Sequence, residues 1–282
     1  MEKQHNFKVF SGFILKVIAV VSMTFDHVGY FLESYENCQE IAKIFRIIGR
    51  LAFPLFIFLL VEGIIHTKNI KNYLIRLGIL EVVFLIGQII YFSFIGKGKV
   101  LISPMLDLFM TAICVYLLSR KDRFSYFAII PLGIAFVSLF IRNYEANNLT
   151  SVSWFPFFLR FDYGIFGPLL GIGFYYANDL AKVFLKSNKG TESFLDTTYE
   201  QTTKNIISVI VLIILTIALC FIDENAMHTF YSIPWEFYSI FAFIPILLYS
   251  GKRGYNAKWF QYGCYIYFPM HLVLIYLIFS LI

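Results

Sequence analysis

The sequence predicts an all-α membrane protein, a polytopic bundle of about nine transmembrane helices, with eight or ten spans left open. Of its 282 residues, 59% are hydrophobic and only 15% are charged. Soluble domains carry about a quarter charged residues, so this chain has too few polar side chains to cover the surface of a soluble protein of its size. The composition excludes a soluble enzyme and a nucleic-acid-binding domain. The partner it predicts first is the lipid bilayer.

Nine apolar stretches are long enough to cross the hydrocarbon core of a membrane, which is about 30 Å thick and takes roughly 20 helical residues. The fourth, fifth and eighth are the least regular. The segment 154–158 can also dip into the bilayer before the sixth stretch begins. The nine stretches are 12–32, 47–66, 74–95, 100–119, 124–141, 157–179, 205–222, 235–250 and 260–281.

The basic residues predict a cytoplasmic N-terminus. With nine alternating spans and that orientation, 16 of the 23 Lys and Arg residues fall on the cytoplasmic side, as the positive-inside rule requires. Residues 182–204, rich in Ser, Thr, Asn and Lys, lack apolar periodicity and are expected to form a flexible cytoplasmic loop. No soluble module remains once the spans are assigned, so we expect one transmembrane domain over residues 1–282.

Ionisable residues inside the apolar stretches are candidate functional residues, because each costs about 2.5 kcal/mol or more at the centre of a membrane helix. Asp26 and His27 are adjacent in the first stretch. A histidine titrates near neutral pH and can serve as a general base or an acyl acceptor, with a carboxylate to orient it or balance its charge. The alternative is a polar cluster that only joins neighbouring helices.

A second histidine, His271, lies in the last stretch at a depth similar to that of His27, so the two imidazoles can face each other across the bundle. Arg46 and Arg50 are four residues apart and share a helix face, which suits a carboxylate or phosphate clamp. Alternatively they extend to the outer headgroups. We predict an ion pair between Arg50 and Asp26.

A glycine-flanked basic turn, 250–254, contains Lys252 and Arg253. Such a turn can bind nucleotide phosphates or serve only as a cytoplasmic anchor. The histidines lie on different spans or loops without the spacing of metal ligands, so no metal site is predicted. The remaining ionisable residues within the apolar stretches are Lys16, Glu62, His66, Glu81, Asp107, Arg160 and Asp162.

Five blocks, in order along the chain, resemble the TraX family. They are 15–29 (LKVIAVVSMTFDHVG), 49–56 (GRLAFPLF) with the following Glu62-Gly63, 162–167 (DYGIFG), 248–254 (LYSGKRG) and 267–271 (YFPMH). The resemblance covers essentially the whole chain. The family's namesake is similar to enzymes that use acetyl-CoA to acetylate the N-terminus of conjugative pilin, and the family is grouped with transmembrane acyltransferases.

Related acyltransferases of type 3 carry a basic residue, ten intervening residues and a histidine in their first span, and Lys16 and His27 have that spacing. The resemblance implies that His27 is catalytic, that acetyl-CoA is the cytoplasmic donor, and that the enzyme lies in a bacterial cytoplasmic membrane. The acceptor would be pilin or another envelope glycan or peptide. We expect Lys16, Lys252 and Arg253 to bind the donor.

Acyl transfer needs a base near the attacking atom and stabilisation of the negative charge that develops on the carbonyl oxygen. His27 can supply the base, with Asp26 beside it, while Arg50, Tyr163 or His271 can support the site. Direct transfer and a covalent acyl-His27 intermediate both fit. Two other functions stay open: a proton-coupled transporter that uses the buried acids and histidine as a relay, and a non-catalytic scaffold for membrane assembly.

Overall fold

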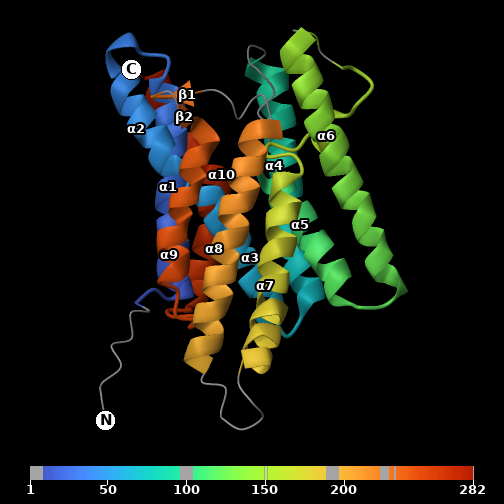
Figure 1. Ribbon diagram of the computed structural model, residues 1–282. Coiled ribbons are helices and arrows are strands. Elements are labelled where there is room, and N and C mark those ends of the chain that lie inside the picture. Colours follow the sequence, from blue (N-terminus) through green and yellow to red (C-terminus); the bar gives the residue numbers. More distant parts are fainter. Residues whose placement is uncertain are drawn as a thin grey trace. The chain divides into compact units, whose positions relative to one another are not determined.

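The computed structural model describes residues 9–95, 104–148, 150, 152–188, 197–222, 229–231 and 233–281 of the chain. It is almost entirely helical (Figure 1). Its helices and strands are α1 (Gly12–Leu32), η1 (Glu36–Cys38), α2 (Gln39–Gly49), α3 (Ala52–His66), α4 (Ile70–Ile95), α5 (Pro104–Ser119), η2 (Arg123–Ala128), α6 (Ile129–Asn148), η3 (Phe157–Leu159), α7 (Phe166–Asn188), α8 (Thr197–Ile222), β1 (Thr229–Phe230), β2 (Ile233–Pro234), η5 (Trp235–Ala242), α9 (Phe243–Leu247) and α10 (Lys258–Ser280).

The prediction of an all-α bundle is confirmed. Among the described residues, six helical segments are long and apolar enough to cross a membrane, and α5 and the η5–α9 segment are shorter apolar helices. The side of the membrane on which the N-terminus lies stays a prediction, and residues 1–8 lie outside the described part of the chain. The six long segments are Gly12–Leu32, Glu36–His66, Ile70–Ile90, Arg123–Asn148, Tyr199–Ile222 and Lys258–Ser280.

The exposed face of α4 shows how these helices meet lipid. Ile75, Ile79, Val82 and Ile86 are 51–59% exposed, and their spacing places them on one side of the helix. A continuous apolar stripe of this kind is unfavourable in water and favourable against lipid chains. The chain is an integral membrane protein.

Three predicted stretches differ from the helices that form. The second stretch, 47–66, is divided between α2 and α3, which end and begin on either side of Arg50 and Leu51. Pro54 then lies in the first turn of α3, where its missing N–H is not needed. The eighth stretch, 235–250, is the 3₁₀ helix η5 followed by the five residues of α9.

The sixth stretch, predicted over 157–179, begins later than expected. Residues 157–159 form only the single turn η3, and α7 starts at Phe166. Hydrogen bonds to buried side chains of α5 and α6 prevent the backbone between η3 and α7 from forming a helix. Phe161 N–H donates to Ser138 Oγ at 2.8 Å, and Asp162 N–H donates to Asp107 Oδ2 at 2.8 Å.

The loop predicted over 182–204 is shorter in the structure. Helix α7 continues to Asn188 and α8 begins at Thr197, so only residues 189–196, which lie outside the described residues, separate the two helices. Lys182 Nζ lies 3.9 Å from Glu200 Oε1 and links the two helix ends.

The described residues divide into two compact units. The first unit comprises 1–59, 173–216 and 237–282, and the second comprises 60–172 and 217–236. In the second unit, α5 packs against α4 and α6, and a cluster of Leu106, Ala135 and Phe161 forms part of its core. The two-residue strands β1 and β2 pair antiparallel in the same unit.

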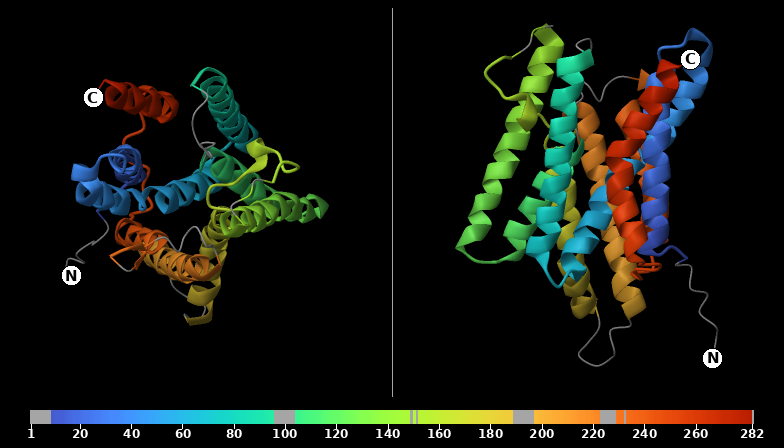
Figure 2. Two further views of the ribbon diagram at one scale, coloured as in Figure 1. Left: turned by 90° about the horizontal axis from the view of Figure 1, so that it is seen from above. Right: turned by 180° about the vertical axis from the view of Figure 1, so that it is seen from behind.

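In the first unit, α1 lies alongside both α2 and α10 (Figures 1 and 2). The two partners come from opposite ends of the sequence, because α2 directly follows α1 and α10 ends at Ser280. This arrangement brings side chains more than 240 residues apart into contact along one seam, which we call the α1–α10 seam. All the candidate residues near His27 lie on it or on the adjoining face of α2.

Candidate active site on the α1–α10 seam

The two membrane histidines contact each other. His27 Nδ1 lies 2.6 Å from His271 Nε2, and the two ring centroids are 4.8 Å apart. His271 is buried, with 2% of its surface exposed, whereas His27 is partly exposed. The prediction that the imidazoles face each other is confirmed.

The hydrogen bonds of this pair determine which nitrogen carries each proton. His271 Nδ1 lies 3.1 Å from the carbonyl oxygen of Tyr267. A carbonyl only accepts, so in the neutral ring Nδ1 of His271 is the protonated nitrogen and Nε2 is the acceptor. His27 Nδ1 must then donate to His271. The lone pair of neutral His27 is therefore on Nε2, the nitrogen a base or nucleophile would use.

The neighbouring turn of α10 fixes the orientation of His271. The Tyr267 ring stacks on the imidazole with centroids 5.3 Å apart and an interplanar angle of 15°. Its hydroxyl lies 2.7 Å from Thr24 Oγ1, and the Thr24 hydroxyl donates its one proton to the Val20 carbonyl at 2.9 Å. Tyr267 O–H is therefore the donor to Thr24. This second link between α1 and α10 was not predicted, because neither residue carries a charge at neutral pH.

Asp26 lies between two buried arginines of the α2 region. Its carboxylate accepts from Arg46 Nη1 at 2.6 Å and from Arg50 Nη2, and each arginine has 6% of its surface exposed. Glu33 Oε1 lies 3.2 Å from Arg46 Nε. The predicted Arg50–Asp26 pair is confirmed, and the two arginines together form the predicted carboxylate clamp. Two positive and two negative groups offset one another within this cluster.

Close packing of α1 on α2 makes this clamp possible. A methyl group at Gly49 would overlap the side chain of Asp26, so only glycine allows the two helices to approach here. The guanidinium of Arg46 also lies over the Tyr30 ring, 5.6 Å from its centroid. A cation–π contact of this kind adds to the stability of a charge held away from water.

The basic turn predicted to bind phosphate also accepts hydrogen bonds from the start of α1. The first two N–H groups of α1 donate to its backbone: Gly12 N–H to the Lys252 carbonyl at 2.8 Å, and Phe13 N–H to the Arg253 carbonyl at 3.0 Å. These donors have no partner within the helix itself. The turn thus caps α1 and joins the start of that helix to the segment that leads into α10.

The side chains of the turn remain exposed. Gly251 and Gly254 adopt φ angles of 72° and 71°, which are unfavourable for other residues, and the backbone between them presents Lys252 and Arg253 to solvent. Arg253 also interacts electrostatically with Lys16. The three cations predicted to bind the donor thus lie at one end of the seam. Lys16 precedes His27 by 11 residues, or about 16 Å of helix.

Tyr163 lies in the second unit, so its predicted part in chemistry at His27 stays a prediction. Its backbone N–H donates to Asp107 Oδ1 at 3.1 Å, while the Asp162 N–H donates to the other oxygen. Asp107 is completely buried. This carboxylate holds the chain that leads into α7, a role that its position in an apolar stretch did not reveal. Within the described residues, no group of three or more His, Cys, Asp or Glu side chains is placed to hold a metal ion.

The family model described as TraX protein matches residues 11–182, more than half of the chain. The chain belongs to the TraX family. Over 68 residues it is also 43% identical to "Probable fimbrial assembly protein FimC, serogroup H1" of Dichelobacter nodosus, a stretch that is 24% of this chain and 27% of that protein. The match thus spans about a quarter of the relative's length. No solved structure matches.

The predicted membership of the TraX family is confirmed, and the matched region contains Asp26, His27 and Arg50. His271 and the basic turn lie beyond its end at residue 182. In this TraX family member the seam is therefore built from a matched helix, α1, and from α10, which lies outside the match. The fold adds His271 to His27 as a hydrogen-bond acceptor.

Proposed function

We propose that this protein is an integral membrane acyltransferase of a bacterial cytoplasmic membrane. It would transfer acetyl from cytoplasmic acetyl-CoA to an amine or hydroxyl of pilin or another envelope molecule. The observation that carries the proposal is the His27–His271 pair, in which Nε2 of His27 has its lone pair available and Nδ1 donates to a second imidazole. An imidazole so arranged is suited to take up a proton or an acyl group.

In the covalent route, Nε2 of His27 attacks the thioester carbonyl carbon. The C–N bond forms, the C–S bond breaks, and CoA leaves as the thiolate. The proton on Nδ1 passes to Nε2 of His271, which leaves a neutral acetyl-imidazole on His27 and an imidazolium on His271. The acceptor amine or hydroxyl then attacks the acetyl carbon and the C–N bond to His27 breaks. The proton on His271 returns to Nδ1 of His27, and the proton of the acceptor neutralises the CoA thiolate.

In the direct route, Nε2 of His27 removes the proton of the acceptor as that group attacks the thioester carbonyl carbon. The C–S bond breaks, and CoA leaves as the thiolate, which takes up the proton at the end of the cycle. The Nδ1 proton again moves to His271, so the positive charge is shared between the two rings. Both routes use the same proton relay. Both also develop negative charge on the carbonyl oxygen, which the guanidiniums of Arg46 and Arg50, although paired with Asp26 and Glu33, can partly offset electrostatically.

The donor would enter from the end of the seam that carries Lys16, Lys252 and Arg253. Exposed cations beside a turn with two glycines at positive φ fit the phosphates of coenzyme A. The separation of about 16 Å along α1 between Lys16 and His27 is one that the long, narrow pantetheine arm would bridge. The acetyl thioester would then lie at the histidine pair.

The pilus-related part of the proposal draws on the relative from Dichelobacter nodosus, which is named for fimbrial assembly. The same name supports a second candidate function, a non-catalytic assembly scaffold. The Asp26 clamp favours that alternative, because a fully paired cluster of charges joins α1 to α2 whether or not His27 reacts. The two functions differ in what they require of His27.

The test is to incubate the protein in lipid nanodiscs with acetyl-CoA that carries a radiolabelled acetyl group, and to follow both CoA thiol release and label on the protein. His27→Asn is compared with His66→Ala, because His66 has a side chain that is 64% exposed and lies on α3. Label on the wild type and on His66→Ala, but not on His27→Asn, supports the covalent route.

CoA release that needs an added acceptor and leaves no label supports the direct route. Absence of both signals from the wild type, together with no thermal stabilisation by acetyl-CoA, would remove the acyltransferase and leave the scaffold.

A further inference from the structure

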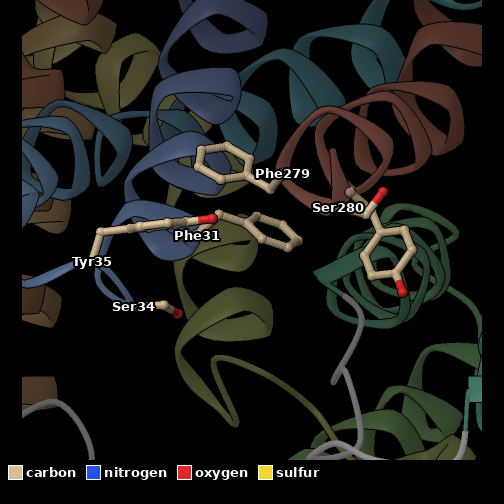
Figure 3. Close-up of a pocket in the computed structure, with 6 residues that line it drawn as sticks. Phe31, Ser34, Tyr35, Phe279 and Ser280 are labelled. Atoms are coloured by element: carbon tan, nitrogen blue, oxygen red, sulfur yellow. The ribbon is translucent and has the colours of Figure 1, made fainter. Parts of the chain in front are cut away.

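Beyond the histidine pair, the α1–α10 seam opens into a pocket of about 240 Å³ (Figure 3). Aromatic side chains from both sides of the seam, among them Phe31, Tyr35 and Phe279, border it in the figure. The Phe31 and Phe279 rings stack with centroids 5.3 Å apart, and the Tyr35 ring lies 6.0 Å from that of Phe279. The lining residues are Phe31, Ser34, Tyr35, Tyr276, Phe279 and Ser280.

The pocket is aligned with the histidines. Phe31 follows His27 by four residues and therefore lies on the same face of α1 as the histidine, and the Phe279 ring of α10 stacks on Phe31. The rise of a helix places the rings about 6 Å and about 12 Å farther along the seam. A ligand in the pocket would therefore lie one helical turn beyond His27 on α1.

The α1–α10 seam has a basic end and a pocket end, with the histidine pair between them. Lys16 precedes His27 on α1, and Lys252 and Arg253 precede α10, so the basic end lies before the histidines on both sides of the seam. The pocket lies after them. A donor held at the basic end and a second substrate held in the pocket would approach the histidine pair from opposite directions.

The lining residues indicate the chemistry of a ligand. None of them carries a formal charge at neutral pH, and four of the six have a hydroxyl group. Ser280 Oγ donates to the Leu277 carbonyl at 2.8 Å and keeps its lone pairs for an incoming donor. Flat aromatic faces beside hydroxyls suit a neutral ring that has C–H groups on one face and hydroxyls around its edge.

The size of the pocket limits the ligand to one ring. Pockets that hold drug-sized ligands have volumes of roughly 300–1,000 Å³, and this pocket is smaller. It would take the end group of a larger acceptor and leave the remainder outside. A pocket that binds a cationic amine would be expected to contain a carboxylate, and the lining residues include none.

We propose that this pocket is the acceptor subsite and that it binds a neutral sugar ring, whose hydroxyl it presents to His27. The inference rests on the proposed acyl transfer and narrows its acceptor to a hydroxyl of a carbohydrate. An aromatic ring of the lining holds the apolar face of the sugar, with the Phe31–Phe279 stack keeping those two rings in place, and the hydroxyls of the lining residues bind its edge. Transfer to such a hydroxyl forms an ester as the bond between the acetyl carbon and its carrier, CoA sulfur or His27 Nε2, breaks. The hydroxyl proton passes to Nε2 of His27 in the direct route and to the CoA thiolate in the covalent route.

Binding can be tested apart from transfer. The protein is placed in lipid nanodiscs free of glycoside detergents, and saturation-transfer NMR is recorded with methyl glucoside as the probe and phenylalanine amide as a cationic, aromatic comparison. We expect methyl glucoside to bind the wild type and His27→Asn, and to bind Phe31→Ala and Phe279→Ala at least about tenfold more weakly. Tyr262→Ala is the matched control, since Tyr262 lies on α10 outside the pocket and is 58% exposed.

Thermal unfolding of each variant separates loss of the pocket from loss of the fold, and Phe279→Leu keeps an apolar side chain while it removes the ring face. Equal binding by the wild type and Phe279→Ala, no binding by the wild type, or preferential binding of phenylalanine amide would overturn the proposal. CoA release on the same preparations reports acyl transfer separately. Glucoside binding without CoA release would remove the proposed function, whereas CoA release without glucoside binding would remove this subsite.

Discussion

Asp26 in the first unit and Asp107 in the second are both acids within apolar helices, yet they are satisfied in different ways. Asp107 is completely buried and accepts two backbone N–H groups, from Asp162 and Tyr163. Asp26 is paired with the guanidiniums of Arg46 and Arg50. The first arrangement holds a chain segment in place. The second holds charge beside a histidine.

The comparison shows that a buried acid is not by itself evidence for chemistry. Both oxygens of Asp107 accept backbone N–H groups, which need a hydrogen-bond partner when they are buried. These hydrogen bonds give Asp107 a structural role that accounts for its burial. In the first unit the charges of the clamp balance one another, and the adjacent His27 keeps a nitrogen that no neighbour needs for the fold. Only the second arrangement leaves a reactive atom available.

The largest effect is expected from Asp26→Ala. This change leaves two buried arginines without their shared partner, and loss of one member of a buried ion pair typically lowers the free energy of unfolding by about 3–5 kcal/mol. Unfolding by SDS in mixed micelles would measure it. Glu40→Ala is the control, because Glu40 pairs with Lys43 at a side chain that is 66% exposed and should have little effect. Equal stability of the two variants would contradict the clamp.

Asp107→Leu tests the structural role of the second aspartate in this comparison. The change leaves the N–H groups of Asp162 and Tyr163 without acceptors, and we expect the free energy of unfolding to fall by about 2–4 kcal/mol. CoA release per folded molecule should stay near the wild-type value. A folded Asp107→Leu variant without CoA release would place this acid in the chemistry and remove the distinction between the two aspartates.

His271→Gln tests the relay with little effect on stability. The glutamine amide can accept the hydrogen bond from Nδ1 of His27 but cannot take its proton, so we expect CoA release to slow about 100-fold. The pH dependence of the rate should lose one titrating group. His271→Leu removes the acceptor altogether and should be slower still. A His271→Gln variant with the wild-type rate and pH profile would reduce His271 to a packing residue.

Gly49→Ala is expected to have the smallest effect. The added methyl overlaps Asp26, so the helices must separate, at a cost of about 1–2 kcal/mol in the free energy of unfolding. Gly263→Ala on α10 is the matched control, because a methyl there meets nothing within 4 Å and should be neutral or slightly stabilising. If both variants unfold alike, the close approach of α1 and α2 does not support the clamp.

The sequence predicts the helices and part of the site for simple physical reasons. Apolar length identifies the helices, and helical rise places His27 and His271 at one depth. The cost of an unpaired charge in a membrane predicts that Asp26 and Arg50 pair. Each of these arguments concerns one residue or one span at a time.

The features that the sequence did not reveal depend on contacts between distant segments. The hydrogen bond between Tyr267 and Thr24 joins two neutral residues 243 positions apart. The turn at Lys252 and Arg253 caps α1 through its carbonyl groups, which every residue has. The late start of α7 results from backbone bonds to Asp107. Periodicity and charge carry no signal for any of them.

The central claim is that His27 reacts and does not merely join helices, and one measurement tests it most directly. CoA thiol release from acetyl-CoA is measured for the wild type and His27→Asn at equal amounts of folded protein, with the SDS unfolding midpoint recorded for each. The account predicts that His27→Asn unfolds at the wild-type midpoint and releases CoA at least about 100-fold more slowly. A variant that keeps the wild-type rate, or whose rate falls only in proportion to its loss of stability, would contradict the claim and favour the scaffold.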